Sequence, residues 1–305
     1  MTLTAASVPE VIANLATAAK DGVRITEFAL PQMNRVLEYT PEDMTVTVEA
    51  GITLAALQQR LAERGQWLPI DPPCPESLSI GALLAGNKSG PRRYGYGTIR
   101  EHLLGIKVVL SDGRVIKAGG KVVKNVAGYD LCKLFVGSRG TLGVIVEAAF
   151  KVLPRPEKEE FVQASGAKLD ALRPLTASEL APVVLDLHNQ EQDTPTLVVG
   201  FAGSREDVDW RLGQARQIGL LEPATLEYEE KFWGEAQEPH RVSVLPSKLL
   251  DTLRDLEASF VARAGNGMIY YRGAQAPEKP RLPGELLRRI KDTYDPRHLL
   301  PDLPW

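Results

Sequence analysis

The sequence predicts an α+β protein built from two parts, and three observations carry that prediction. Glycine-rich loops lead repeatedly into apolar strands before Pro154, without the regular strand–helix alternation of a parallel sheet. Residues 153–160, LPRPEKEE, combine proline with charge, as a domain boundary does. Beyond them, strands and helices alternate again, which is typical of a small sandwich with helices on one face of an antiparallel sheet.

The first part should contain two capped helices and three strand regions. Residues 8–20 have apolar side chains at helical spacing, with Gly22 as the stop. Residues 44–50 alternate as a half-buried strand does, and a helix follows Thr53, a good N-cap, to Gly65. Two strands around Asp112-Gly113 should form a hairpin, because an Asp-Gly pair between apolar runs is a strong turn signal. A glycine-rich turn at residues 137–143 then leads into a long strand.

The second part should alternate strands with amphipathic helices. Ser204 and Asp207 have capping-box spacing and predict the start of a helix that runs to residue 219. A further helix is expected over residues 248–265, KLLDTLRDLEASFVARAG. The expected strands cover residues 183–188, 196–203, 241–247 and 267–273.

Composition excludes several classes of function. The 305 residues are 44% hydrophobic and carry a formal net charge of −3, so nothing suggests nucleic-acid binding. No apolar run approaches a membrane span and no signal peptide is evident, so we expect a cytoplasmic protein with no direct membrane insertion. Cys74 and Cys132 are too few to ligate a cluster or a structural zinc, and we expect both to be free and packed. No metal site is predicted.

Glycine is unusually dense in residues 79–97, SIGALLAGNKSGPRRYGYG, and again near residues 124–131 and 137–145. Each segment could be an ordinary tight turn, since glycine is the default turn residue. Together they favour another interpretation, because successive backbone N–H groups in such turns can hold phosphate oxygens. This interpretation predicts a bound dinucleotide. Arg92 and Arg93 are either a solvated pair or contacts for pyrophosphate or a partner.

These motifs, taken in order, resemble those of a known family. The stretch LSIGALLAGNKSGPRRYGYGTIREHLLGIKVVLSDGRVIKAGG, together with KNVAGYDL and GSRGTLGVIVEAAFKVLPRP, resembles the FAD-binding (PCMH-type) domain of the vanillyl-alcohol oxidase / p-cresol methylhydroxylase superfamily. Within it, the likeness is greatest to the E subunit of bacterial glycolate oxidase. The resemblance implies a two-lobed FAD-binding domain over residues 1–155, with a shortened first lobe. A smaller α+β sandwich, a cap domain, would follow over residues 156–305.

The resemblance also implies which residues contact a non-covalent FAD. The implied contacts with the pyrophosphate, ribityl and flavin parts are Ser79, Ile80, Gly81, Ala82, Gly86, Asn87, Lys88 and Ser89. Those with the adenine side are Arg139, Gly140, Thr141, Leu142, Gly143, Val144 and Ile145. Ala82 replaces a second glycine of the family pattern, and Arg139 stands where an acidic residue is usual. Lys124, Asn125, Gly128 and Tyr129 match a motif whose implied role is structural.

Two parts of the family pattern are missing. The first glycine-rich phosphate loop, with its flanking strands, is absent between the N-terminal helix and Asn34. The histidines and acids that bind substrate in hydroxy-acid oxidases have no counterpart in residues 264–271, AGNGMIYY. No catalytic residue can therefore be assigned, and the weakened phosphate site puts FAD affinity in question.

Three interpretations stay open at this point. The first is an FAD-binding subunit of a glycolate oxidase or D-lactate dehydrogenase-like complex, which relays electrons between a sister FAD-linked dehydrogenase subunit and an iron–sulfur subunit. Any membrane association would then be made through these partners. The second is a flavin-free scaffold subunit of the same complex. The third is a self-sufficient flavin oxidoreductase on an unknown substrate, with Tyr94, Tyr96 or Tyr129 near the flavin.

Overall fold

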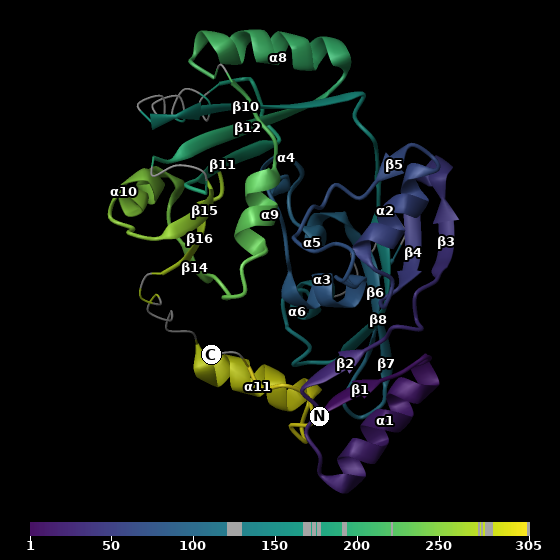
Figure 1. Cartoon of the computed structure of the whole chain (residues 1–305). Coiled ribbons are helices and arrows are strands. Elements are labelled where there is room, and N and C mark those ends of the chain that lie inside the picture. Colours follow the sequence, from purple (N-terminus) through teal and green to yellow (C-terminus); the bar gives the residue numbers. More distant parts are fainter. Residues whose placement is uncertain are drawn as a thin grey trace.

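A computed structural model of the chain describes most of its residues (Figure 1). The described residues are 1–120, 130–166, 172, 175, 178–190, 194–220, 222–273, 275, 277 and 283–303. The predicted structural motif at Lys124, Asn125, Gly128 and Tyr129 lies outside them.

A small lobe opens the chain. Strand β1 (Thr2–Thr4) pairs in parallel with β2 (Glu27–Ala29), and helix α1 (Val8–Asp21) connects them. Ser7 caps α1 at its start and Gly22, in the left-handed region, ends it as expected. The prediction that strands are missing between this helix and Asn34 was wrong, since β2 lies there. Only residues 22–26 join α1 to β2, so a phosphate-binding loop has no room between them.

The larger lobe is a five-stranded antiparallel sheet in the order β3-β4-β8-β6-β7. The predicted hairpin at Asp112-Gly113 joins β6 to β7, and Thr53 caps α2 as expected. A two-stranded ribbon, β5 with β9, closes one end. The strands are β3 (Val36–Thr40), β4 (Thr45–Glu49), β5 (Gln66–Trp67), β6 (Leu103–Val109), β7 (Val115–Gly119), β8 (Val144–Lys151) and β9 (Leu153–Pro154). The helices are α2 (Leu54–Ala62), α3 (Ile80–Gly86), α4 (Arg93–Tyr96), α5 (Ile99–His102) and α6 (Cys132–Phe135).

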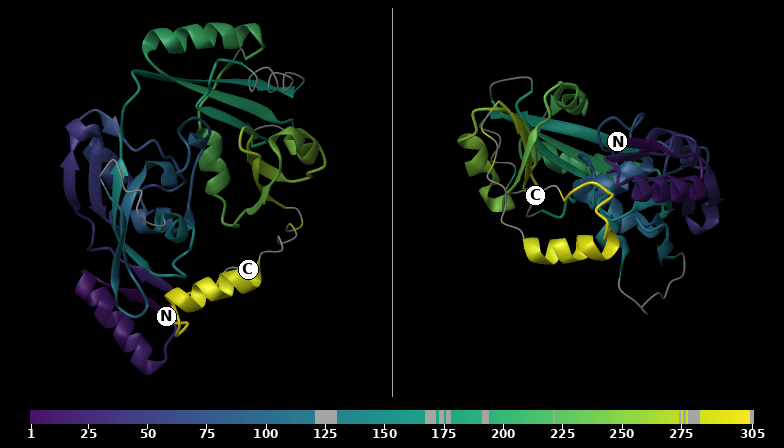
Figure 2. Two further views of the ribbon diagram at one scale, coloured as in Figure 1. Left: turned by 180° about the vertical axis from the view of Figure 1, so that it is seen from behind. Right: turned by 90° about the horizontal axis from the view of Figure 1, so that it is seen from below.

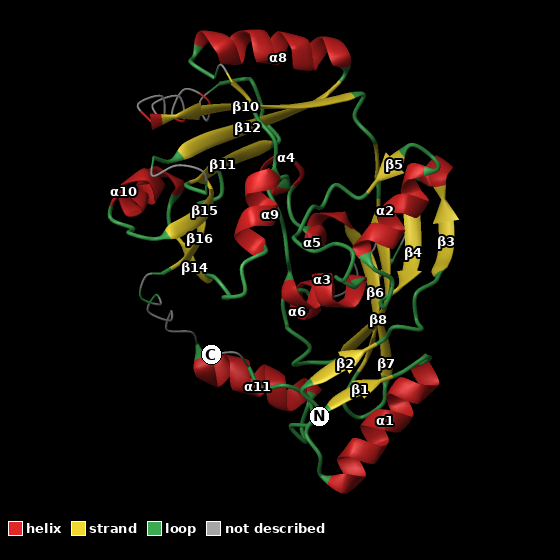
Figure 3. Cartoon of the chain, in the orientation of Figure 1, coloured by secondary structure: helices red, strands yellow, loops and turns green. Residues whose placement is uncertain are grey.

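The second part is a seven-stranded antiparallel sheet in the order β13-β10-β12-β11-β15-β16-β14 (Figure 3). Its strands are β10 (Lys158–Ser165), β11 (Val184–His188), β12 (Thr196–Gly203), β13 (Glu222–Pro223), β14 (His240–Ser243), β15 (Ser259–Arg263) and β16 (Met268–Arg272). Its helices are α8 (Arg205–Gln217), α9 (Glu227–Trp233) and α10 (Leu249–Arg254).

Helices cover both faces of this sheet, which corrects the expectation of helices on one face. Val208 of α8 and Leu253 of α10 pack with Leu187 and Phe201 on one face. Phe232 of α9 packs on the other face, with Val198 and Val261. Helix α9 thereby lies between the second sheet and the first part of the chain (Figure 1).

The helix expected over residues 248–265 was also wrong in its second half. Helix α10 ends at Arg254, and residues 259–263 form β15, which pairs with β11 and β16 near the centre of the sheet. Four consecutive residues of this strand are buried because both faces of the sheet are covered. A continuous apolar run cannot be told from a buried helix by its periodicity.

The C-terminal helix α11 (Gly284–Tyr294) returns to the first part of the chain (Figure 2). Tyr294 packs edge-on against Phe135, with ring centroids 5.7 Å apart, and Leu300 belongs to the first core. Ser111 Oγ donates to the backbone oxygen of Tyr294 at 3.0 Å. The predicted boundary near residue 155 stays a prediction, but residues 284–303 lie with the first domain rather than with the second.

Candidate functional site

The first group of predicted cofactor residues forms the start of helix α3. Ser79 is its N-cap and accepts a hydrogen bond from the Ala82 N–H at 3.2 Å. The N–H of Ile80 donates to Ile52 O at 2.9 Å, and that of Gly81 donates to Ala50 O at 2.7 Å. These amides already donate to backbone oxygens, so they are not available to bind a phosphate at the start of α3.

Two of the predicted glycines are needed for close packing. A Cβ atom at Gly81 would lie 3.2 Å from the backbone oxygen of Ala50, and one at Gly143 would lie 2.6 Å from Val108 Cγ1. Gly140 differs, because it has a φ of +75° and a Cβ there would meet nothing within 4 Å. Much of the glycine density in residues 79–97 and 137–143 therefore serves the fold, while Gly140 borders open space.

The structure brings the two predicted groups together where α3 ends. The N–H of Gly137 donates to Leu84 O at 2.9 Å, and that of Arg139 donates to Ala85 O at 2.8 Å. Asn87 ends the helix in the left-handed region, with a φ of 46°. We call residues 84–89 and 137–141 the α3–β8 junction. It unites the predicted contacts Gly86 to Ser89 with Arg139 to Thr141.

Two buried polar atoms at this junction lack a hydrogen-bond partner among the described residues. They are Asn87 Oδ1 and Ser138 Oγ. Buried polar atoms are nearly always paired, so orphaned ones at one junction indicate capacity for a ligand. Lys88 and Arg139 are exposed beside them and supply positive charge. Residues of this kind fit an anionic dinucleotide. Ser138 was not among the predicted contacts, although the GSRG motif contains it.

The predicted contacts from Thr141 to Ile145 are buried in the fold. Val144 and Ile145 belong to β8, and the backbone oxygen of Thr141 accepts from Lys291 Nζ of α11 at 2.7 Å. Lys291 is 3% exposed and also pairs with Asp295 at 2.6 Å. The C-terminal helix therefore holds one edge of the junction in place.

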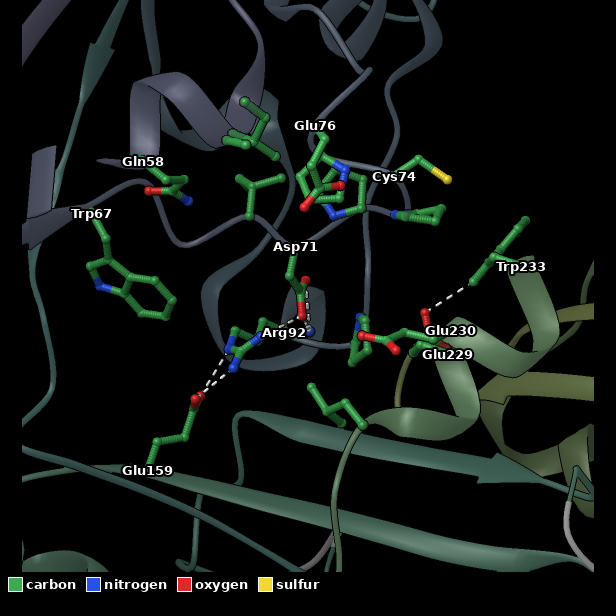
Figure 4. Close-up of a pocket in the computed structure, with 18 of the residues that line it drawn as sticks. Gln58, Trp67, Asp71, Cys74, Glu76, Arg92, Glu159, Glu229, Glu230 and Trp233 are labelled. Atoms are coloured by element: carbon green, nitrogen blue, oxygen red, sulfur yellow. Dashed lines mark hydrogen bonds and ion pairs between the residues drawn. The ribbon is translucent and has the colours of Figure 1, made fainter. Parts of the chain in front are cut away.

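A second feature is an open cleft of about 950 Å³ between the two parts of the chain (Figure 4). We call it the interdomain cleft. Trp67 and Trp233 lie on opposite sides of it, with Asp71 and Arg92 between them. Of the predicted cofactor residues, none lines this cleft, which begins beside them at Pro75, Glu76 and Pro91.

Arg92 ties the two parts together across the cleft. Its Nη1 lies 2.9 Å from Asp71 Oδ2, and its Nε donates to Glu159 Oε1 at 2.8 Å. The Arg92 side chain is only 16% exposed. The interpretations of Arg92 as a solvated residue and as a pyrophosphate contact are therefore wrong. It is not a solvated loop residue, and its donors are occupied by carboxylates rather than free for phosphate.

A second arginine of the same kind lies behind the cleft. Arg263 of β15 forms two 2.8 Å hydrogen bonds with Glu229 and also pairs with Asp186. Tyr228 donates to Asp186 at 2.7 Å. Burial raises the pKa of Asp186 to about 7, although Arg263 opposes the shift. Burial likewise raises the pKa of Asp71. No sequence motif predicted this cluster of buried ion pairs around Arg263.

The tyrosines suggested as flavin neighbours take structural positions. Tyr94 packs against the second core and closely against Gly265, and Tyr96 meets the edge of Trp67 at 5.3 Å between centroids. Tyr129 lies outside the described residues. Cys132 is buried and Cys74 is exposed, so the expectation that both are packed was wrong for Cys74. Within the described ranges, no group of three or more His, Cys, Asp or Glu side chains could hold a metal ion.

Comparison with known proteins identifies the first part of the chain. Residues 14–119 match the model of a family described as FAD binding domain. Over these residues the chain is similar to that family. The matched range includes the small lobe from Asn14, helix α3 and the β6–β7 hairpin, whereas residues 137–141 of the α3–β8 junction follow it.

Curated relatives agree with this assignment. The chain is 36% identical over 167 residues to the glycolate oxidase subunit GlcD of Bacillus subtilis, covering 55% of this chain and 36% of that protein. It is 36% identical over 149 residues to the subunit GlcE of Escherichia coli, covering 48% and 43%. With a probable mitochondrial D-lactate dehydrogenase of Danio rerio it shares 34% over 211 residues, covering 63% and 42%. The chain thus spans less than half the length of each of these relatives.

Solved structures resemble the whole fold. An alkyldihydroxyacetonephosphate synthase superposes with a TM-score of 0.70 at 19% identity, covering 98% of this chain and 76% of that one. The two-lobed α+β architecture followed by a second α+β part is therefore shared. No helix in the described part of the chain is long and apolar enough to cross a membrane.

Proposed function

We propose that this chain is an FAD-binding subunit of a glycolate oxidase-like or D-lactate dehydrogenase-like complex, where it relays electrons from 2-hydroxy acid oxidation. The observation that carries the proposal is the α3–β8 junction, where Asn87 Oδ1 and Ser138 Oγ are buried without partners beside Lys88 and Arg139. The family match and the two glycolate oxidase relatives support the same conclusion.

In this proposal the junction holds FAD without a covalent bond. Asn87 and Ser138 would hydrogen-bond the cofactor, and Lys88 and Arg139 would face its phosphates. Gly140 leaves room for a close backbone approach. When bound, FAD supplies reversible electron acceptance, while the chain's residues position it and set its electrostatic surroundings.

We infer a relay role because the interdomain cleft is poorly suited to bind a 2-hydroxy acid. A 2-hydroxy acid is an anion, and its carboxylate would need a cation with free donors. Arg92 is committed to Asp71 and Glu159, and Arg155, the other cation of the cleft lining, is exposed and outnumbered there by five carboxylates. We therefore assign substrate oxidation to a sister FAD-linked dehydrogenase subunit and onward electron transfer to an iron–sulfur subunit. A cytoplasmic location, with any membrane contact made by partners, completes the proposal.

The test is to titrate the purified chain with FAD and to record the visible flavin absorption after gel filtration. Lys88→Glu combined with Arg139→Glu should weaken FAD binding at least ~tenfold, because two cations near the phosphates become anions. Lys20→Glu on α1 makes the same kind of charge change far from the junction and should leave binding unchanged. Equal loss in both variants, or equal retention, would contradict the assigned site.

A second candidate is the flavin-free scaffold subunit. It is favoured by the five-residue link at 22–26, which leaves no room for a first phosphate loop, and by the internally bonded amides at the start of α3. A scaffold would show no flavin bands at any FAD concentration, yet would co-purify with its partner subunits.

A further inference from the structure

The buried ion pairs around Arg263 contain more negative than positive groups. We call Asp186, Tyr228, Glu229 and Arg263 the Arg263 cluster. Its two carboxylates share one guanidinium group, and the side chains of Asp186 and Arg263 are 0% and 2% exposed. The Tyr228 hydroxyl donates to Asp186 Oδ2 at 2.7 Å, and burial raises its pKa well above the usual range, so it stays neutral. With both carboxylates ionised, the cluster would therefore hold a net negative charge almost without access to water.

One position in the cluster is able to hold a proton. Both oxygens of Glu229 accept hydrogen bonds from Arg263 at 2.8 Å, and Asp186 Oδ2 accepts from Tyr228 and Arg263. Asp186 Oδ1, by contrast, is buried and has no hydrogen-bond partner among the described residues. A proton on this oxygen leaves one carboxylate and one guanidinium group, so the cluster becomes neutral. Burial raises the pKa of Asp186 to about 7 for this reason, with a contribution from Glu229 and against the effect of Arg263.

Neighbouring strands of the second sheet supply no permanent positive charge to the cluster. On β12, the residue paired with Asp186 is the apolar Val198. From β16, the Tyr270 ring lies 5.9 Å from the guanidinium carbon of the central arginine. On β11, the His188 ring stacks on the cluster's tyrosine, with centroids 4.3 Å apart. Among these residues only His188 titrates near neutral pH, so its contribution needs a variant of its own.

The groups that face the cluster from the cleft side are mainly negative. Asp71 of the first part lies within electrostatic reach of Arg263 and Glu229. Its own cation, Arg92, also pairs with Glu159, so these three residues together add no positive charge. The residue after Glu229 on α9 is a further glutamate. A proton on Asp186 is therefore the available way to neutralise the cluster without moving a side chain.

Helix α9 is the side of the cluster that can move. Tyr228 and Glu229 belong to this helix of seven residues, whereas Asp186 and Arg263 belong to strands near the centre of the sheet. Glu229 is also the less buried carboxylate, with 12% of its side chain exposed. A helix this short has few internal hydrogen bonds and depends on its packing. Repulsion between two ionised carboxylates is therefore relieved when Glu229 moves toward water together with α9.

We propose that the Arg263 cluster is a pH-dependent switch for the position of helix α9. While Asp186 holds a proton, α9 is attached to the inner face of the second sheet. Loss of that proton to solvent favours detachment of the helix and solvation of Glu229. Because Glu229 and Trp233 also line the interdomain cleft, the switch moves one wall of that cleft. It does not depend on FAD binding at the α3–β8 junction.

The sign of the effect follows from proton binding. Detachment exposes Asp186 to water, where its pKa returns toward the ordinary value of about 4. Between about pH 4 and 7 the attached helix therefore binds one proton more than the detached helix. Attachment is strongest at the acid end, weakens as the pH rises through this window and stays constant above it.

Hydrogen exchange with mass spectrometry on the full chain measures attachment, because α9 and α8 give separate peptides. After correction for the intrinsic exchange rate, protection of residues 227–234 should fall by up to about tenfold per pH unit between about pH 5 and 7, then level off. Protection of α8, which covers the opposite face of the same sheet, should change less. Equal pH dependence in α9 and α8, or α9 protection that does not fall with pH, would overturn the proposal.

Variants identify the titrating group. Asp186→Asn keeps the side-chain shape without its charge, so α9 protection should no longer depend on pH. Glu229→Gln removes the second carboxylate and should also abolish the dependence above about pH 5; it changes a partly exposed residue, which covers the case that Asp186→Asn fails to fold. His188→Phe keeps the ring stack, and Asp251→Asn removes a carboxylate on α10 that is 63% exposed; both should keep the natural pH dependence. Loss of the dependence in His188→Phe, or its retention in Asp186→Asn or Glu229→Gln, would contradict the assignment to Asp186.

Discussion

The α3–β8 junction and the interdomain cleft differ in how their positive charges are placed. At the junction, two buried polar atoms are left without partners and the nearby cations are exposed. Around the cleft, the buried arginines are bonded to carboxylates from distant parts of the chain. Unpaired polar atoms beside exposed charge are what a ligand requires, whereas a network of buried ion pairs, although Asp186 Oδ1 and Arg263 Nε lack a partner within it, mainly fixes the relative position of two domains. The comparison supports the proposal that the junction binds the cofactor, and it gives the cluster behind the cleft the role of fixing the two domains.

The largest effect should come from removing a buried arginine. Arg263→Leu leaves Asp186 and Glu229 buried without a cation, which should lower the free energy of unfolding by ~3–5 kcal/mol. Urea denaturation measures the loss. Arg254→Leu is the control, because this arginine of α10 is 75% exposed at its side chain and, among the described residues, pairs only with Asp251. A loss as small as that of Arg254→Leu would show that the cluster does not stabilise the fold.

Asp186 should make stability depend on pH. Its folded pKa of about 7 lies above that of an exposed aspartate, so between about pH 4 and 7 the folded state retains a proton that the unfolded state has lost. This contribution to stability is present at low pH and is lost as the pH rises through that window, by up to ~1.4 kcal/mol per pH unit. Urea denaturation across this range should show a shallower fall in Asp186→Asn than in the natural chain. If the free energy of unfolding falls equally with pH in both proteins, the pH dependence comes from other groups.

Lys291→Met, at the edge of the junction, should lower the free energy of unfolding by a smaller amount. The variant removes the hydrogen bond to Thr141 O and leaves Asp295 without its cation, although the Leu299 and Leu300 amides still donate to that carboxylate. We expect a loss of ~2–3 kcal/mol in urea denaturation. Because Thr141 belongs to the junction, FAD affinity should fall as well. If stability falls while FAD affinity is unchanged, Lys291 anchors the tail but does not position the cofactor site.

The smallest effect on stability is expected for Lys88→Glu. Its side chain is exposed at the junction, so the free energy of unfolding should change by less than ~0.5 kcal/mol. The same variant should weaken FAD binding, which separates the binding role of the junction from its structural one. Lys88→Arg keeps the charge and should retain affinity. If Lys88→Glu binds FAD as tightly as the natural chain, the phosphates do not face this residue.

Local signals predicted most elements correctly. Thr53 and Ser204 cap helices as predicted, and the Asp112-Gly113 turn joins two strands. These features depend on hydrogen bonds between residues a few positions apart, so the sequence states them directly. The helix expected over residues 248–265 was partly wrong, because the strand Ser259–Arg263 depends on partners in β11 and β16 rather than on its own periodicity.

The sequence by itself determined the fold class, the FAD-binding resemblance and the short link of the first lobe, because each depends on residues that are close together in the sequence. Only the tertiary structure decided the role of Arg92, whose partners lie 21 and 67 residues away. It also decided that α9 covers the inner face of the second sheet and that Lys291 reaches Thr141, 150 residues away. The physical reason is that a charged side chain stays buried only where the fold places an oppositely charged partner beside it. No local sequence pattern predicts which distant residue that partner will be.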